Sequence, residues 1–415
     1  MTDVNDLPVE VLGYIFNLAA EDERSTPSTL RLGRYLRFWG GKFHSACAPF
    51  VFLSVCGHWR AVAEATPLLW TPLDATMRTA CRGALMPIEA LEHWLSLSKS
   101  APLEFFLQGS NREDDASKEE VAAHTDAMLD VLANQAHRWR SAAFEVDFHL
   151  AGVLVDMLLN QFNPLSLPNL KKLEVVAFYD KRGPLPVEDL ARAIGGIQSL
   201  KELYLYMHHD ECVPSLLRDI PWGQLTTVYL GMDLSVHQVA TILALSSSAV
   251  TATFDGVYGA PVSDSNEQRS TLVRLKTLTM NGREGIFSLL DRFNFPGLEQ
   301  LNIISSSYSN DEPLKRLVER SPSRIRQIGL HVKGRLSGSD LAKYLRMLRQ
   351  VSHVEFNATG VREIAPSAVD QLKDDIPVLW FWRPFLGLEC IGWKTQFDRT
   401  DGQVIRITPA TKIVT

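Results

Sequence analysis

The six residues Leu200-Lys-Glu-Leu-Tyr-Leu205 decide the fold, because the same phrase returns along most of the chain. Its pattern is apolar-x-x-apolar-x-apolar, and the alternation in its second half predicts a strand with one buried face. The copies lie at 170–175, 200–205, 225–230, 275–280, 298–303, 325–330 and 351–356. Their middle apolar residues are 30, 25, 50, 23, 27 and 26 residues apart, and the step of 50 is two periods with a worn copy at 249–256.

A period near 26 residues lies within the range of leucine-rich repeats, whose units each hold a strand and a helix and stack to bury a continuous core. Segments of helical texture at 186–194, 235–245 and 337–350 separate the copies, and Ser235 and Ser339 are expected helix caps. The expected fold class is α/β: a small N-terminal helical module followed by an irregular leucine-rich-repeat-like α/β solenoid with a parallel sheet. It is irregular because the asparagine that such repeats place three residues beyond the phrase is missing. Further strands are expected at 103–107, 144–148 and 388–393, the last of them beside Trp380 and Trp382.

The residues between the apolar positions of each strand are expected on a concave face. This face is polar and aromatic with little positive charge, which suits a protein or peptide better than nucleic acid. The alternative is that these residues are merely solvated and that ligands use the loops. The residues expected to bind a target are Glu202, Tyr204, Tyr206, Tyr229, Asn302, His331 and Glu355.

Two apolar segments precede the repeats, at 7–22 and 53–74. In the first, Pro8 suits the first helical turn, Leu7 is the expected cap, and the apolar side chains spread over about 180° of the helix, wider than one core-facing stripe. In the second, Cys56 and Trp59 lie with other apolar residues at helical spacing. A module this small has a marginal core, so the surplus apolar surface serves either a partner or the following domain. Spacing alone leaves the two alternatives level.

These segments resemble the F-box, the short helical module that binds the Skp1 adaptor of cullin–RING ubiquitin ligases. The motif L-P-x-E-V-L-x-x-I-F starts at Leu7, V-C-x-x-W-R at Val55 and P-x-L-W at Pro67, in the order of the family. The match covers about residues 5–75 and is similar to F-box families of mushroom-forming fungi, although the spacer of about 21–50 is longer than in the compact family form. The resemblance implies that the module core and the Skp1 contact share Leu7, Pro8, Val11, Leu12, Ile15, Phe16, Val55, Trp59 and Trp70. Leu7 and Pro8 are the first contact candidates, because the family docks that end of its first helix.

The composition limits the classes of binding partner and the cellular compartment that we expect. The chain has 415 residues, a formal net charge of −6 and five widely spaced cysteines without a C-x-x-C pair, which favours a reducing compartment and disfavours nucleic acid and anionic membranes. The N-terminus lacks the pattern of a signal peptide, and the cluster at 378–388 is too short to span a bilayer. We expect a cytoplasmic or nuclear protein that binds neither nucleic acid nor membrane.

The sequence contains no specific catalytic signature. A zinc site of His44, Cys47, Cys56 and His58 is not expected, because structural zinc sites pair their ligands more tightly in sequence. The acidic and histidine-rich run at 208–212 is expected in a loop. The S-x-x-K match at 96–99 is expected to end a helix. We therefore expect a non-catalytic adaptor with no cofactor and no metal.

The resemblance implies that residues 1–75 form the F-box-like module, 76–100 a linker helix and 101–415 the solenoid with its C-terminal cap. The module would bind a Skp1-type protein and through it a cullin, and the solenoid would hold an unknown target for ubiquitin transfer. The alternative is a repeat scaffold or inhibitor whose F-box-like helices pack on the solenoid or bind Skp1 without transfer. A hydrolase on an atypical repeat fold would need a nucleophile and base that the sequence does not contain as a motif.

Overall fold

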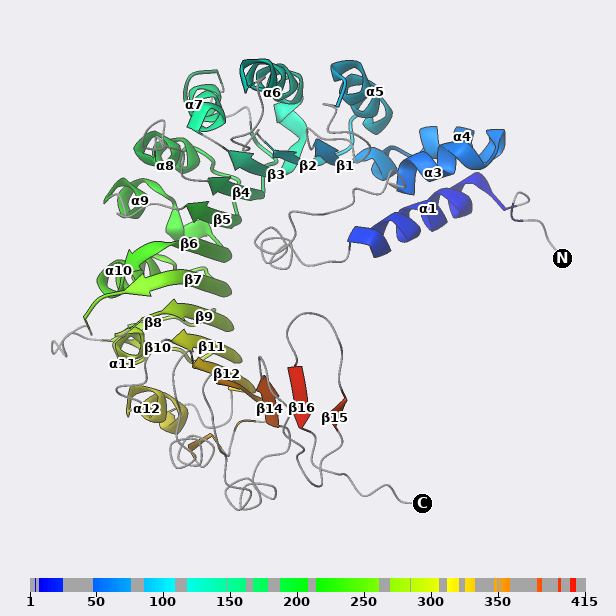
Figure 1. The fold of residues 1–415 in the computed structure, drawn as a ribbon. Helices are drawn as coiled ribbons and strands as arrows, with labels where there is room; N and C mark the ends of the chain where they lie inside the picture. The colour runs from blue at the N-terminus through cyan, green and yellow to red at the C-terminus, as the bar shows by residue number, and fades with distance from the viewer. Residues whose placement is uncertain are drawn as a thin grey trace, which may run out of the picture. The chain divides into compact units, whose positions relative to one another are not determined.

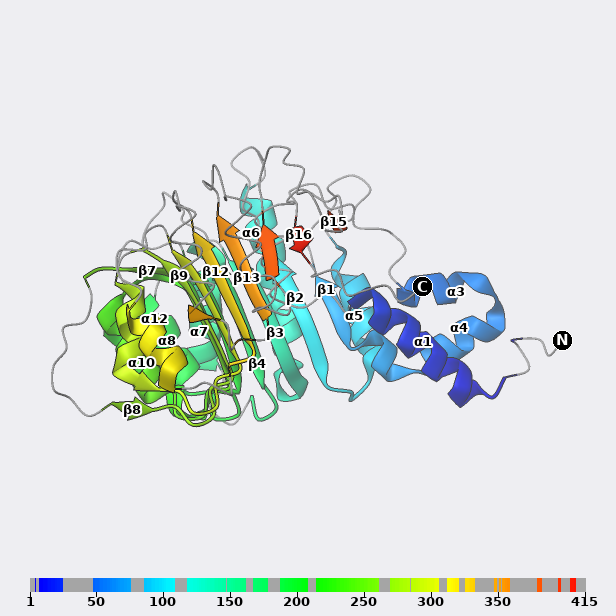
Figure 2. The same cartoon turned by 90° about the horizontal axis from the view of Figure 1, so that it is seen from below.

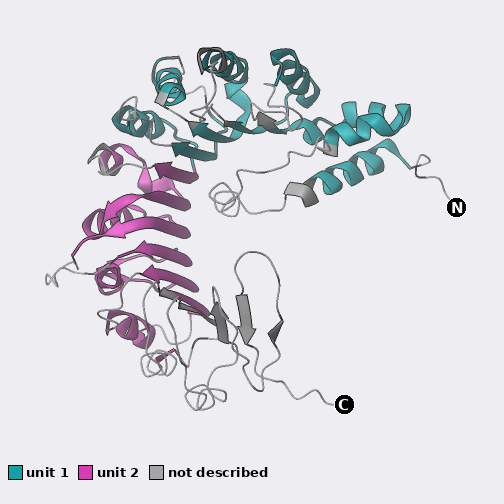
Figure 3. Ribbon diagram, viewed as in Figure 1, with its two compact units in different colours: residues 1–200 teal, residues 201–415 magenta. Residues whose placement is uncertain are grey.

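The computed structural model describes residues 4, 7–24, 48–75, 86–108, 118–146, 148–161, 167–177, 187–207, 214–260, 269–283, 285–305, 312–320, 325–332, 347–348, 351, 353–358, 379–382, 395–396 and 404–407. The chain divides into two compact units, residues 1–200 and residues 201–415, shown in two colours in Figure 3.

Unit 1 opens with short helices and continues as a parallel sheet. The helices are α1 (Val9–Arg24), α3 (Ala48–Val55), α4 (Gly57–Glu64) and the 3-10 turn η2 (Pro67–Trp70). The strands β1 (Pro72–Ala75), β2 (Leu103–Gln108), β3 (Trp139–Val146) and β4 (Lys172–Ala177) pair in that order, all parallel. The connections carry α5 (Ile88–Ser98), α6 (Lys118–Ala133), η3 (Ala136–Arg138), α7 (Phe148–Asp156) with the π-helical turn η4 (Met157–Gln161), and, after β4, α8 (Val187–Gly195). In Figure 1 these helices lie along one side of the strands.

Unit 2 repeats the strand–helix alternation over a longer sheet. Its parallel strands are β5 (Glu202–Met207), β6 (Thr227–Ser235), β7 (Thr251–Tyr258), β9 (Thr277–Gly282), β11 (Gln300–Ser305), β12 (Gln327–Val332), β13 (His353–Ala358) and β14 (Leu379–Trp382). The antiparallel strands β16 (Val404–Ile407) and β15 (Thr395–Gln396) follow. The helical elements are α9 (Pro214–Asp219), η6 (Trp222–Gln224), α10 (Val236–Leu245), η7 (Ile286–Ser288), α11 (Leu289–Arg292) and α12 (Glu312–Arg320), and β8 (Ser270–Thr271) pairs with β10 (Phe293–Asn294). Figure 2 shows α10 and α12 on one side of this sheet.

The repeated phrase sets the register of unit 2, because equivalent residues of neighbouring strands stand side by side. Leu203 pairs with Val228, and the row continues along the sheet to Leu278, Leu301 and Ile328. Every residue of this row is almost fully buried. Stacked apolar rows of this kind supply the core that no single repeat can build alone.

Most of the predicted elements are confirmed. The worn copy at 249–256 belongs to β7, and the segments expected at 186–194 and 235–245 form α8 and α10. Ser235 caps α10 in a reciprocal capping box, since its Oγ accepts from the Gln238 backbone N–H and the Gln238 side chain accepts from the Ser235 backbone N–H. The strand expected at 388–393, the cap Ser339 and most of 337–350 lie outside the described residues.

Three local expectations need correction. The segment around Trp59 is two helices, because Cys56 adopts an extended conformation (φ −160°, ψ 170°) and its Sγ caps α4 by accepting from the Trp59 N–H. Cys56 is therefore exposed and is not part of an apolar stripe. Helix α1 begins at Val9, with the Pro8 carbonyl accepting from the Val11 and Leu12 N–H groups, so Pro8 and not Leu7 is the cap. The strand expected at 144–148 starts earlier, at Trp139, and gives way to α7 at Phe148.

Strand β1 lies inside the range predicted for the F-box-like module, and α5 inside the predicted linker. The boundaries of the predicted domains stay a prediction. Among the described residues, none of the helices is both long and apolar enough to span a membrane.

A buried arginine ties α5 to the start of β3. Arg138 is 4% exposed and donates to the carbonyl oxygens of Leu95, Lys99 and Ala101 and to the Ser98 hydroxyl. The cation thus satisfies the orphan carbonyls at the C-terminal end of a helix, where the dipole favours positive charge. Burial lowers the pKa of Arg138 from its ordinary value. Its hydrogen bonds to neutral oxygens hold the first repeats of unit 1 together.

Candidate functional site

The structure divides the residues of the F-box resemblance into a core and an exposed set. Leu12, Phe16 and Trp70 are at most 1% exposed and form core. Val11, Ile15 and Val55 are 44%, 42% and 52% exposed. Pro8 is exposed, whereas Leu7 and Trp59 are half-buried. The residues that the sequence left undivided therefore separate into buried, half-buried and exposed members.

Aromatic contacts hold Phe16 in the core. The Phe16 ring stacks on Phe52 with centroids 4.2 Å apart and planes 8° apart, and lies 4.9 Å from the Trp59 ring. These contacts join α1, α3 and α4. Phe16 and Trp59 thus stabilise the module from inside, since aromatic pairs at such spacing add to the burial of their surface.

Trp70 fastens the module to the first repeat. Its Nε1 donates to the Ala63 carbonyl over 2.8 Å, and its own carbonyl accepts from Nε1 of Trp94 in α5 over 2.7 Å. The two rings meet edge to face at 5.5 Å. We assign Trp70 to the core, because its ring is fully buried.

Helix α1 carries an apolar stripe on the side opposite its core residues. Val11, Tyr14, Ile15 and Leu18 are 42–63% exposed and stand at i, i+3, i+4 and i+7, which places them on one face. Leu12, Phe16 and Ala20 occupy the other face and are buried. We call Val11, Tyr14, Ile15 and Leu18 the α1 stripe. The F-box resemblance implies a contact role for only Val11 and Ile15 of the four, and Tyr14 was missed although it has the same helical spacing.

The sheet face of unit 2 that lies away from the apolar row is called here the open face. It consists of three rows of residues aligned by the strand register. The rows are Glu202, Thr227, Thr251, Thr277, Gln300, Gln327 and His353; then Tyr204, Tyr229, Thr253, Thr279, Asn302, Gly329 and Glu355; then Tyr206, Gly231, Asp255, Asn281, Ile304, His331 and Asn357.

The residues expected to bind a target divide into a cluster and outlying members. Glu202, Tyr204, Tyr206 and Tyr229 stand together on β5 and β6. Asn302 shares the row of Tyr204 and Tyr229 but lies three strands beyond β6, where its Nδ2 donates to the Thr279 hydroxyl over 3.3 Å. His331 and Glu355 hold their register positions still farther along, on β12 and β13.

Two residues beside the cluster, Gly231 and Asp255, were not predicted from the sequence to belong to the site. Gly231 stands beside Tyr206 in the register, and a Cβ there would lie 2.3 Å from Tyr206 Cδ2, so the tyrosine ring occupies the space above the glycine. Asp255 follows in the same row and accepts from Asn281 Nδ2 over 2.5 Å. Burial first, and the negative charge of Asp255 second, raise the pKa of Tyr206 from its ordinary value. Only the register of neighbouring strands brings these residues together.

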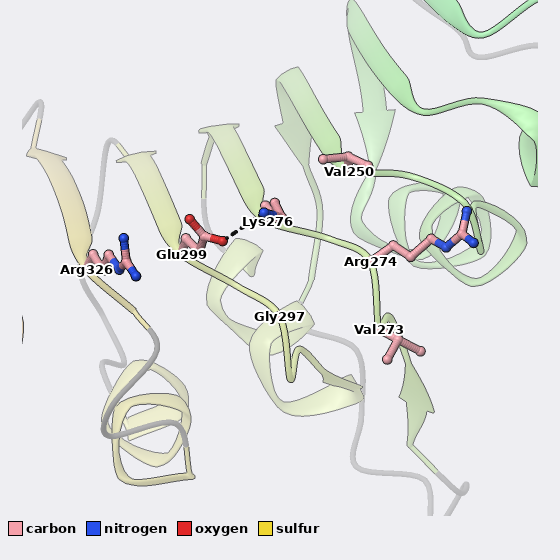
Figure 4. A pocket seen from close by; sticks show the side chains of 7 residues that line it. All are labelled: Val250, Val273, Arg274, Lys276, Gly297, Glu299 and Arg326. Carbon is pink, nitrogen blue, oxygen red and sulfur yellow. Dashed lines mark ion pairs between the residues drawn. The ribbon is translucent and has the colours of Figure 1, made fainter.

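A cavity of about 500 Å³ lies where strands of unit 2 begin (Figure 4). Its lining consists of Val250, Val273, Arg274, Lys276, Gly297, Glu299 and Arg326. Lys276 and Glu299 form an ion pair at 3.1 Å, and a Cβ on Gly297 would come within 2.7 Å of the Val273 carbonyl oxygen. The cavity is therefore a charged recess between closely packed chain segments.

The candidate metal and catalytic sequences find no support among the residues that the structure describes. No group of His, Cys, Asp and Glu in those ranges could hold a metal ion. His44, Cys47 and the run at 208–212 lie outside them. The S-x-x-K match at 96–99 closes α5, as predicted, with Lys99 as its C-cap residue.

Comparison with models of known families finds no match, and comparison with curated proteins finds none either. Among solved structures, a chain of one described as "Crystal structure of Rad7 and Elc1 complex in yeast" resembles this protein with a TM-score of 0.43 and 10% sequence identity. The alignment covers 89% of this chain and 86% of the other. At this identity and TM-score the likeness does not indicate a function.

Proposed function

We propose that this protein is the substrate-recognition adaptor of a Skp1–cullin–F-box type ubiquitin ligase. Its N-terminal helices bind a Skp1-type protein, which connects it to a cullin, and its open face binds a target protein. The observation that carries the proposal is the exposed α1 stripe, which lies on the helix whose sequence matches the start of the F-box motif.

The stripe is unnecessary for the module's own fold. Leu12, Phe16 and Ala20 already provide the buried side of α1. Contiguous exposed apolar side chains on one helix face lower solubility unless a partner covers them, and interaction sites are their usual explanation. An amphipathic helix of this kind suits a partner that offers an apolar groove.

The proposed mechanism needs no catalytic residue in this chain. Holding a target next to a ligase raises the effective concentration of its lysine side chains near the activated ubiquitin. The role requires only that one part of the chain binds the Skp1-type protein and that another part binds the target.

Titration of the full chain with a purified Skp1-type protein tests the proposal. We expect Val11→Asp and Ile15→Asp each to weaken binding by at least about tenfold, because a buried carboxylate in an apolar contact lacks a partner. Val273→Asp is the matched control, since Val273 is 67% exposed and lies in unit 2. Equal binding by all four proteins would contradict the assignment of the stripe, and absence of binding by the parent would contradict the adaptor role.

Reconstituted ubiquitin transfer separates the adaptor from the scaffold or inhibitor alternative. An adaptor supports transfer to a protein held by the open face, and the transfer stops with Ile15→Asp. A chain that binds the Skp1-type protein but never supports transfer to a bound protein would favour the inhibitor.

A further inference from the structure

The open face of unit 2 has a one-sided charge. At the open-face positions of β5, β6, β7, β9 and β11 there is no lysine and no arginine, while two positions are acidic: Glu202 and Asp255. Most of the remaining positions carry threonine, glutamine or asparagine. Such a face repels phosphate and acidic segments and attracts cationic ones.

A tyrosine cluster lies on this face between two of the acidic residues. The rings of Tyr204 and Tyr229 stack at 6.2 Å with planes 24° apart, and Tyr206 covers Gly231. Tyr204 is only 7% exposed, whereas Tyr206 and Tyr229 are half-buried. The cluster therefore presents two half-buried aromatic side chains beside a third that is buried.

The acidic residues are placed at both ends of the cluster. The Tyr204 hydroxyl donates to Glu202 Oε2 over 3.4 Å, and Asp255 is next but one to Tyr206 along its row. Asn281 holds the Asp255 carboxyl from the opposite side. Aromatic faces flanked by carboxylates are the arrangement that binds guanidinium and ammonium groups, which interact with the ring quadrupole and pair with the acids.

We propose that the open face binds a basic segment of the target, with an arginine or lysine side chain seated on Tyr206 and Tyr229 between Glu202 and Asp255. This inference rests on the proposed function and gives the chemical class of the target. The cavity at the strand starts is a different surface: it is lined by Arg274, Lys276 and Arg326 with one acid, Glu299, and it would repel the same segment. Of these two surfaces, only the open face would attract a basic segment.

The probes are three fluorescein-labelled peptides in which arginine, glutamate or glutamine alternates with glycine and serine. Fluorescence anisotropy with the full chain measures their dissociation constants. We expect the arginine peptide to bind at least about tenfold tighter than the glutamine peptide and the glutamate peptide not to bind. The Glu202→Gln/Asp255→Asn double variant should lose most of this preference.

Two controls separate the site from the general charge of the protein. Glu312→Gln/Glu319→Gln changes the net charge equally but alters exposed residues of α12, and it should leave the arginine peptide's affinity within about twofold.

Tyr206→Phe and Tyr229→Phe should retain binding of the arginine peptide, whereas Tyr206→Leu/Tyr229→Leu should weaken it about fivefold, because leucine preserves apolar contact but not the ring quadrupole. Circular dichroism confirms that each variant folds.

The proposal is overturned if the three peptides bind alike, if the glutamate peptide binds best, or if the α12 control weakens binding as much as the double variant. Titration with a Skp1-type protein, through the α1 stripe, is measured on the same samples. If the chain binds the Skp1-type protein but does not discriminate between the peptides, only the proposal of a basic target segment is refuted. If the chain discriminates between the peptides but does not bind the Skp1-type protein, the ligase role is refuted and the protein is a receptor for basic segments.

Discussion

Two glycines of unit 2 differ in the obstacle that a side chain would meet. A Cβ on Gly231 would meet the Tyr206 ring, which can rotate, but a Cβ on Gly282 would lie 2.1 Å from the Val257 carbonyl oxygen, which belongs to the backbone. We expect Gly231→Ala to cost about 1–2 kcal/mol of unfolding free energy and Gly282→Ala about 3 kcal/mol. Urea unfolding measures both. Gly223→Ala, whose Cβ meets nothing closer than 3.7 Å, is the control and should change stability by less than about 0.5 kcal/mol. A larger cost at Gly231 than at Gly282 would contradict this order.

The ionisation of Tyr206 reports on its surroundings. Its pKa is raised from 10.0, chiefly by burial and then by Asp255, so the folded state holds the phenol proton more strongly than the unfolded state does. The resulting stability is fully present below the unfolded pKa and is lost as pH rises through the folded pKa. We expect Asp255→Asn to lower the pKa of Tyr206 only part of the way, because burial remains. Absorbance titration at alkaline pH, as the difference from Tyr206→Phe, checks this, and an unchanged pKa would exclude a charge interaction.

At the scale of elements, α1 carries one buried and one exposed side with different roles. Leu12 is 0% exposed and Ile15 is 42% exposed. Leu12→Ala should cost about 2–5 kcal/mol of unfolding free energy, through lost burial and a cavity, and Ile15→Ala less than about 1 kcal/mol. Hydrogen exchange of the α1 and α4 amides measures the local effect. Equal loss of protection in both variants would mean that Ile15 is part of the core.

Elements with strong periodicity could be predicted from the sequence, and elements decided by local hydrogen bonding could not. The repeated phrase located β4 to β7, β9 and β11 to β13, because alternation and period agree with each other. The break at Cys56 was missed because the apolar spacing continues across it, while a thiol cap and the extended backbone interrupt the helix. The division of α1 into core and stripe also needed the structure, since its apolar arc was too wide to divide.

At the scale of the whole molecule, the sequence predicted the polar and aromatic character of the open face and the tyrosines of its cluster, but not the neighbours of that cluster. Tyr204, Tyr206 and Tyr229 follow from the strand pattern alone. Gly231 and Asp255 could not be singled out, because their importance depends on the residue beside them in the next strand. A sheet built from distant repeats makes sites from residues that share no motif.

The two proposed surfaces belong to different units, the α1 stripe to unit 1 and the open-face cluster to unit 2. Changes that share no contacts usually have additive effects on free energy, and we expect this of substitutions in separate units. We therefore expect Glu202→Gln/Asp255→Asn to leave the affinity for a Skp1-type protein within about twofold, and Ile15→Asp to leave arginine-peptide binding equally unchanged. Combining all three substitutions in one chain completes a double-mutant cycle, measured by both titrations. Ubiquitin transfer, in contrast, requires both surfaces at once and should fail when either is altered. A coupling of tenfold or more between the two binding events would show that one surface controls the other, and the protein would then act as a switch and not as a tether.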